Sequence, residues 1–278
     1  MTTSCEAAGG AMVHDVVQDH PHVRRSDLQR GRFVARFARD AADLQAAGQL
    51  RHLCFVQQAG RADLPGGVEQ DSFDAQCDHV LIEEAASGRL VCCFRIMLLP
   101  DGAALGQSYS AQYYDLTDMA GFAAPMAELG RFCTAPDGAD ADVLRLAWGV
   151  LARFVDDSGV ALLFGCSSFA GTDPAAYGQA FGVLASQYQA PDRWTPAVKA
   201  DKVHRYAAQL PEGFDPRGAS KAAAAQLPPL LKTYLSMGGW VSDHAVIDEA
   251  MNTLHVFTGL EIAAIPPARA RALRAIAE

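Results

Sequence analysis

Alternating apolar and polar residues predict the first elements of this chain. From Phe33 to Phe37 every second residue is apolar and arginines flank them, a pattern typical of a half-buried strand. Asp40 then caps a helix whose apolar residues recur at helical spacing from Leu44 to Leu50. The Gly and Pro residues between positions 60 and 67 end it. The regular structure therefore begins with a strand and a helix.

The middle of the chain predicts a hairpin, then alternating strands and helices. The hairpin pairs His79 to Glu83 with Leu90 to Leu99 across a Ser-Gly turn. The elements after it are a strand over Met126 to Thr134, a helix over Val143 to Val155, a strand over Leu162 to Cys166 and a helix starting at Asp173-Pro174. This order favours an α/β layer on a mixed sheet.

The last third predicts an extension of this layer. After about residue 190, a polar connection leads to Ser220–Met237, where apolar residues form a helical stripe behind Pro228-Pro229. A last strand region covers Ala245–Glu261. We predict an α/β (α+β) fold with a mixed twisted sheet, helices on both faces and a C-terminal helical and strand extension. Residues 1–30 lack apolar periodicity and are expected to form a flexible arm, which places the single domain at residues 31–278.

Composition excludes several classes of function. The 278 residues are half hydrophobic and carry a formal net charge of −9, so they lack the basic stripe of a nucleic-acid-binding protein. No apolar run approaches the ~18 residues that span a bilayer. Seven cysteines without a CxxC pair, and no secretory leader, indicate reduced thiols. We expect a cytoplasmic protein, with peripheral contact at the inner membrane left open.

Charged residues inside apolar strands are the strongest functional signal, because burying a charge is costly unless it is paired or used. Glu128 and Arg131 lie in one predicted strand, and Arg95 lies in another beside Phe94. Arg95 needs a carboxylate partner, for which Glu128 or Asp74 is available. Glu128 and Arg131 are three apart, which places them on opposite faces of a regular strand and on one face if the strand contains a bulge.

Two more groups of residues are open to a functional or a structural interpretation. Asp71, Asp74 and Asp78 surround Phe73, either as a site for an ammonium group or as a solvated turn. Arg51 and Phe55 share a helix face, either as part of a site or as a surface arginine beside a core phenylalanine. Together these residues supply acids that bind or deprotonate an amine, and arginines that orient them or bind a carboxylate.

Other chemistries find little support in the sequence. Ser167 and Ser168 lie outside any GxSxG motif, so no acyl-serine intermediate is expected. The eight histidines are scattered along the chain, and we expect neither a metal nor another cofactor.

Four segments also carry a resemblance to a known family. They are Gly130-Arg-Phe-Cys-Thr, Leu163-Phe-Gly-Cys-Ser-Ser-Phe-Ala-Gly-Thr-Asp-Pro, Leu227-Pro-Pro-Leu-Leu-Lys-Thr-Tyr-Leu and Val246-Ile-Asp-Glu-Ala-Met-Asn-Thr. Over about residues 31–262 the chain resembles the bacterial ornithine N-acyltransferases that make lyso-ornithine lipid. That family is similar to the acyl-homoserine-lactone synthases, and both have a GNAT-like acyltransferase fold.

The resemblance implies a set of site residues. The synthase pattern is matched here by Arg51 and Phe55, Asp71 and Asp74, Arg95, and then Glu128 and Arg131. By resemblance Glu128 is the general base, with its pKa raised by apolar neighbours, and Arg131 and Arg95 orient the acids. Asp71 and Asp74 would hold the acceptor amines, and a backbone N–H near Phe132 would receive the oxyanion.

The resemblance also implies the substrates. A 3-hydroxyacyl chain would pass to the α-amine of ornithine or a related amino acid. Relatives of the fold that use acetyl-CoA carry a glycine-rich pyrophosphate loop, whereas residues 136–142 hold one glycine and three acids, so acyl carrier protein fits better as the donor.

Two other functions remain alternatives. A signal synthase would acylate S-adenosylmethionine and close a lactone, but those shorter enzymes lack the helix around Ser220 and the Leu227-Pro-Pro segment. A non-catalytic lipid- or protein-binding member of the fold would not need the charged set described above.

Overall fold

The computed structural model describes residue 23, residues 26–138 and residues 140–278. Residues 1–22 and 24–25 of the predicted arm lie outside this described part. The end of the arm needs correction, because Leu28–Arg30 is strand β1, paired antiparallel with the next strand. Val23 is also buried. Three residues are too short a strand to give a readable alternation, so the sequence pattern missed it.

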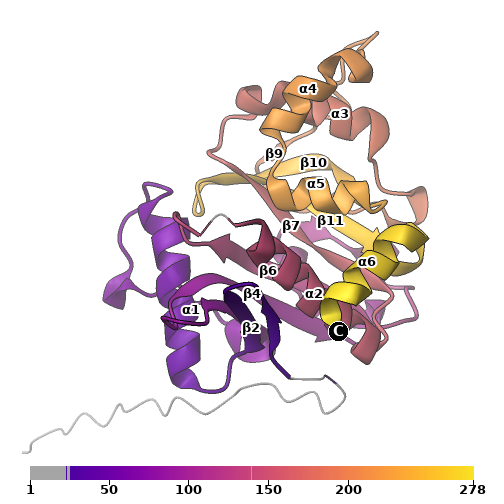
Figure 1. The fold of residues 1–278 in the computed structure, drawn as a ribbon. Coiled ribbons are helices and arrows are strands. Elements are labelled where there is room, and N and C mark those ends of the chain that lie inside the picture. Colours follow the sequence, from indigo (N-terminus) through magenta and orange to yellow (C-terminus); the bar gives the residue numbers. More distant parts are fainter. Residues whose placement is uncertain (1–22, 24–25, 139) are drawn as a thin grey trace, which may run out of the picture.

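One mixed sheet crosses the molecule in the order β1-β2-β3-β4-β6-β7-β11-β10-β9 (Figure 1). Its strands are β1, β2 (Phe33–Phe37), β3 (Asp78–Glu84), β4 (Leu90–Leu99), β6 (Met126–Thr134), β7 (Leu162–Ala170), β9 (Val203–His204), β10 (Trp240–Asp248) and β11 (Thr253–Glu261). Strands β6 and β7 are parallel, and the other neighbours in this described sheet are antiparallel. Strands β5 (Tyr114–Asp115) and β8 (Ala197–Val198) pair separately. The predicted mixed sheet and hairpin are confirmed.

Helices connect and cover these strands. They are α1 (Ala41–His52), which continues as a π-helix over Leu53–Gln57, α2 (Ala141–Ser158), α3 (Gly178–Gln187), α4 (Pro216–Gln226), α5 (Pro229–Ser236) and α6 (Pro267–Ala277). The predicted cap of α1 is confirmed, because the Asp40 carboxylate accepts a hydrogen bond from the Asp43 N–H. Asp173 caps a 3₁₀ turn that leads into α3.

The C-terminal elements differ from the prediction in detail. The helical region over Ser220–Met237 is divided into α4 and α5, because Pro228 cannot continue a helix and holds Leu227 in an extended conformation. The last strand region is a hairpin of β10 and β11. Helix α6 was not predicted. Strands β10 and β11 belong to the main sheet; the placement of one domain at 31–278 stays a prediction.

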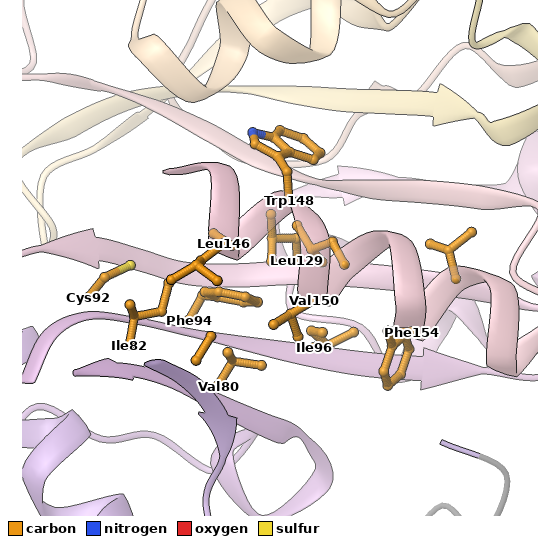
Figure 2. Packing of buried hydrophobic residues seen from close by; sticks show 14 of the residues in the cluster. Val80, Ile82, Cys92, Phe94, Ile96, Leu129, Leu146, Trp148, Val150 and Phe154 are labelled. Atoms are coloured by element: carbon orange, nitrogen blue, oxygen red, sulfur yellow. The ribbon is translucent and has the colours of Figure 1, made fainter. Parts of the chain in front are cut away.

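The two faces of the sheet carry different layers. On one face α2 packs through Leu146, Val150 and Phe154 onto Phe94 and Ile96 and the buried residues beside them (Figure 2). Helix α1 packs on the opposite face, against Cys93 and Cys133. Because side chains alternate along a strand, Arg95 points away from the α2 core. The alternation of β4 therefore directs Arg95 toward the α1 side, where the candidate site lies.

Candidate active site

The sheet splits between its two parallel strands. Pairing of β6 with β7 covers only Met126–Glu128 against Leu162–Phe164. Beyond that point β6 stays paired with β4 as far as Thr134, while β7 stays paired with β11 as far as Ala170. Gly165 lies at the start of the split, where an added Cβ would be 2.4 Å from the Leu129 carbonyl oxygen. A glycine is needed for so close an approach.

A cavity of about 860 Å³ occupies the split. Its walls are β6 and β7, and the first residues of α2 and α5 line it from one face of the sheet. From the other face it is lined by Phe55, Phe73, Tyr109 and the β10–β11 hairpin. Residues from both faces of the sheet thus line one cavity.

A bulge in β6 determines which side chains meet in this cavity. Cys93 pairs with Cys133 and Arg95 with Gly130, so the single residue Phe94 of β4 is opposed by two residues of β6, Arg131 and Phe132. Arg131 has a left-handed backbone, with φ of 53°. The bulge brings Arg131 and Glu128 to the same region around Tyr109, so the opposite-face arrangement of a regular strand does not hold.

Arg95 is paired with the two aspartates that precede β3. Its Nη1 lies 2.5 Å from Asp71 Oδ1 and 2.5 Å from Asp74 Oδ1, and its Nη2 lies 2.9 Å from Asp71 Oδ2. Asp74 is therefore confirmed as a carboxylate partner of Arg95, and Asp71 is a second one. Within the described part of the chain, Glu128 makes no ion pair with this arginine.

The other two arginines complete a compensated cluster. Arg51 Nε lies 2.5 Å from Glu69 Oε2, and its Nη1 lies 2.7 Å from Asp74 Oδ1. Arg131 Nε lies 3.1 Å from Glu69 Oε1, and its Nη2 lies 2.9 Å from Asp71 Oδ2. The three arginines and three carboxylates balance in formal charge, as buried charges require.

The aspartates are ionised and stand behind the cavity wall. Burial alone would raise the pKa of Asp71, but its hydrogen bonds to Arg95 outweigh this and hold the pKa below its usual value. Burial opposes ionisation of Asp74 too, and the charge of Arg51 lowers the pKa of Asp74 far below normal. Arg95 and Arg131 line the cavity in front of them. Binding of the acceptor amine by Asp71 and Asp74 stays a prediction.

Glu128 is a buried carboxylate in the cavity wall. Its Oε2 accepts a hydrogen bond from the Tyr109 N–H at 2.8 Å, and its Oε1 accepts from the Ser110 N–H and hydroxyl at 2.7 and 2.5 Å. Burial raises the pKa of Glu128 above its ordinary value, although these donors act against the rise. A carboxylate has about four acceptor positions, so one remains for a proton.

The remaining predicted residues lie either in the cavity wall or behind it. Phe55 and Phe132 line the cavity, and Phe132 stacks on Phe94 with ring centroids 5.4 Å apart. Arg51 is almost fully buried behind the wall. The structure therefore brings the predicted set together, with Arg51, Asp71 and Asp74 behind the residues that face the ligand space.

Several site residues escaped the sequence analysis. Glu69 joins Arg51 to Arg131, and it is placed by Gly48, whose carbonyl accepts the Glu69 N–H at 3.0 Å. Tyr109 lies under the Arg131 guanidinium, 4.7 Å from its ring centroid. Asp248 and His255 also line the cavity. Glu69, Tyr109 and Asp248 occur where polar residues are common, whereas His255 lies in an apolar strand. Only the Val246–Thr253 motif pointed to one of them, Asp248.

Other sequence expectations concern chemistry outside this cluster. Ser167 donates no bond to a base in the described structure and instead accepts one from Thr258 at 2.8 Å. In residues 23, 26–138 and 140–278 no group of His, Cys, Asp and Glu could hold a metal ion. The six cysteines described are free. None of the described helices combines the length and hydropathy needed to cross a bilayer.

The split mixed sheet, with a buried carboxylate at the fork, defines the class as an acyltransferase of the GNAT fold. Residues 50–149 match a family model described as an acetyltransferase (GNAT) domain. Among solved structures, an N-acyl amino acid synthase from uncultured soil microbes is 12% identical with a TM-score of 0.45, covering 88% of this chain and 97% of that one. A CoA-dependent acyl-homoserine lactone synthase is 16% identical with a TM-score of 0.44, covering 84% and 80%. These remote likenesses do not bear on the reaction.

Curated relatives give the family. An L-ornithine N(alpha)-acyltransferase of Rhodobacter capsulatus is 33% identical, covering 81% of this chain and 88% of that protein. One of Brucella abortus is also 33% identical, covering 84% and 85%. The chain belongs to the L-ornithine N(alpha)-acyltransferase family and is an acyltransferase that takes an acyl donor and an amino acid acceptor. The predicted resemblance, fold class and enzyme class are confirmed.

Proposed function

We propose that this enzyme transfers a 3-hydroxyacyl chain from acyl carrier protein to the α-amine of ornithine or a closely related amino acid, giving lyso-ornithine lipid. The observation that carries the proposal is the buried Glu128 carboxylate at the fork of the split, in the wall of a cavity lined by residues from both faces of the sheet. The names of the relatives support ornithine as the acceptor. We place the reaction in the cytoplasm, and the acyl chain of the product is the reason to propose peripheral contact with the inner membrane.

In the proposed mechanism Glu128 prepares the amine for attack. An α-ammonium cannot attack a thioester until it loses a proton, and Glu128 takes this proton directly or through water. The amine nitrogen then bonds to the thioester carbon and the oxyanion is held by a backbone N–H near Phe132. The C–S bond breaks, the pantetheine sulfur leaves as a thiol with the second amine proton, and an amide remains.

Arg95 and Arg131 orient the acceptor in this proposal. Both line the cavity, and Arg131 is fixed from behind by Glu69 and Asp71. A guanidinium held in this way suits the α-carboxylate of an amino acid, because its planar donors match the two oxygens. Asp71 and Asp74 then act as positioning residues for the arginines.

The end of the cavity beside α2, where we place the acyl donor, favours a carrier protein over coenzyme A. Gly138 and Asp140 line this end, and the Asp140 carboxylate caps α2 by accepting the Asp142 N–H. The helix N-terminus is thus already neutralised by acids, which disfavours the pyrophosphate of coenzyme A.

The experiment that tests the function uses the purified chain with 3-hydroxyacyl carrier protein and ornithine. Mass spectrometry should detect N-acyl-ornithine carrying the acyl group on its α-nitrogen. A panel of other amino acids and S-adenosylmethionine separates the alternatives. A lactone from S-adenosylmethionine, or no amide with any amino acid, would contradict the proposal.

A further inference from the structure

Asp248 is a buried carboxylate that lacks a cationic partner. It ends β10, is 6% exposed and lines the cavity. Its Oδ1 accepts the Met251 N–H at 2.9 Å, and its Oδ2 accepts the Tyr113 hydroxyl at 3.4 Å. No Lys, Arg or His of the described ranges forms an ion pair with it, in contrast to Asp71, Asp74 and Glu69. Since buried charges are normally compensated, a cation is expected from a ligand.

His255 stands beside this carboxylate with a free acceptor. It is 2% exposed and lines the same cavity. The Tyr114 hydroxyl donates to the His255 carbonyl oxygen at 2.8 Å and lies 3.1 Å from Nδ1, so Nδ1 is the protonated nitrogen. Nε2 then carries a lone pair, and no atom of the described residues bonds to it. Burial lowers the pKa of His255 to about 4, so the ring stays neutral at pH 7 and does not compensate Asp248.

A chain of contacts joins Asp248 to the proposed reaction centre. The Tyr113 hydroxyl, which donates to Asp248, lies 3.3 Å from the Tyr109 hydroxyl. The Tyr109 N–H donates to Glu128. On the β7 side, Cys166 Sγ lies 3.5 Å from the Ser110 hydroxyl that bonds to Glu128. Glu128 and Asp248 thus face one cavity from the same side of the sheet.

We propose that Asp248 binds the ammonium group on the side chain of the acceptor, with His255 Nε2 accepting another of its hydrogens. This inference rests on the proposed function. The α-amine would meet Glu128 while the second amine meets Asp248, so one wall distinguishes the two ends of a diamino acid. Asp248 would therefore select acceptors whose aliphatic side chain ends in a cation.

The alternative to ligand binding is a purely structural role for Asp248, and two variants distinguish them. Its Oδ1 bond to the Met251 N–H shapes the β10–β11 turn, where Asn252 has a left-handed backbone and donates to the Ala59 carbonyl at 3.0 Å. Asp248→Asn keeps an oxygen for this bond and removes the charge. Glu249→Gln is the matched control, because it removes a charge from the adjacent, exposed position.

The experiment compares ornithine with norvaline, which has the same carbon chain without the terminal amine. We expect the wild-type enzyme to favour ornithine in kcat/KM by about ten- to a hundredfold, the effect of a charge-assisted hydrogen bond. In Asp248→Asn this ratio should fall close to one, whereas Glu249→Gln should keep the wild-type ratio. Thermal melting of each variant verifies the fold.

The outcomes separate the inference from the function beneath it. If the wild-type enzyme acylates neither amino acid, the proposed function fails and the inference with it. Equal use of both amino acids by the wild-type enzyme overturns the inference while acylation stands, and this measurement needs no variant. A wild-type ratio that survives in Asp248→Asn overturns the inference and leaves the proposed acylation standing.

Discussion

Charge compensation separates the roles of single residues in the site. Arg51, Arg95 and Arg131 share three carboxylates, so these charges hold one another in place. Glu128 and Asp248 are buried without a paired cation in the described part of the chain. A carboxylate in this condition is available to an incoming ammonium, since the free enzyme leaves its charge uncompensated.

Glu128→Gln should lower kcat by ~10²–10⁴, the usual effect of losing a general base. The amide keeps the shape of the side chain, but its NH2 group replaces an oxygen that accepts a backbone N–H, so the melting temperature should also fall. The wild-type kcat/KM should fall toward acid pH as Glu128 becomes protonated. This fall should be centred at a pH above the ordinary carboxyl pKa of 4.5, because burial raises the pKa of Glu128. Near wild-type turnover of a folded Glu128→Gln across this pH range would exclude Glu128 as the base.

Asp74→Asn should mainly destabilise the protein. It leaves Arg51 and Arg95 each short of one buried carboxylate contact, and breaking a buried pair costs about 3–5 kcal/mol. The pKa of Asp74 is lowered in the folded state, so its contribution is present above the ordinary value of 3.8 and is lost as the pH falls below it. The difference between wild type and variant should therefore shrink toward acid pH.

Urea unfolding measures this difference, and Asp137→Asn serves as its control. Asp137 makes an exposed ion pair with Arg89, so the variant should change stability by at most about 1 kcal/mol. Equal effects of the two substitutions would show that the buried cluster is not the source of stability.

The sequence identified site residues where a charge interrupts an apolar run. Arg95 and Glu128 stand out because their neighbours on the strand are hydrophobic. Glu69 and Asp248 do not, since acids are ordinary in loops and at strand ends. Their burial depends on distant segments, such as the contact of Gly48 with the chain around Glu69. Local patterns cannot reveal such contacts.

Elements in which apolar residues recur at a regular spacing were predicted well, and elements without such spacing were not. The strands around Phe33 and Arg95 and the helix α2 have regular apolar spacing and are confirmed. Strand β9 has two residues and β1 three, too few for a period. The bulge in β6 adds one residue to a mostly apolar run, so the hydrophobic pattern alone does not fix its position.

Gly165→Ala should test the start of the split between β6 and β7. The added Cβ would meet the Leu129 backbone oxygen at 2.4 Å, and backbone cannot rotate away as a side chain could. We expect a loss of about 1–3 kcal/mol, as for overpacking in a core, together with reduced acyl transfer because Glu128 lies one residue before Leu129.

The control is Gly178→Ala, at the start of α3, where the added Cβ has no atom within 4 Å. That variant should be neutral or gain up to about 1 kcal/mol. Chemical denaturation of both proteins gives the comparison. A Gly165→Ala protein as stable and active as the wild type would mean that the strands can separate at this point without consequence.

At the scale of the whole molecule, strand order places the last third of the chain beside the proposed reaction centre. Strand β11 pairs with β7 over nine residues, from Thr253↔Ala170 to Glu261↔Leu162, and this brings Asp248 and His255 to the cavity. The sequence predicted a strand region here but not its neighbour. Pairing between segments about ninety residues apart depends on the whole fold, so the pattern of one segment does not specify it.

The two ends of the cavity predict a donor preference that belongs to the whole enzyme. In the proposed function the acceptor end is the one that contains Asp248, and the proposed donor end lies beside α2 with its cap Asp140. The acid at the donor end should repel the extra phosphates of coenzyme A more than the single phosphodiester of a carrier protein. At equal acyl length, the carrier-protein thioester should therefore give the higher kcat/KM.

Asp140→Ser tests the cause of this preference, because serine keeps the helix cap and removes the charge. The variant should use acyl-CoA better by about fivefold, the effect of ~1 kcal/mol for one charge near a phosphate in water. Asp173→Ser makes the same change at the cap of the 3₁₀ turn outside the cavity and should leave the donor ratio unchanged. Equal efficiency of the two donors with the wild-type enzyme would refute carrier-protein dependence. An equal response of both variants would instead trace the preference to the net charge of the molecule, and not to the acids at the cavity.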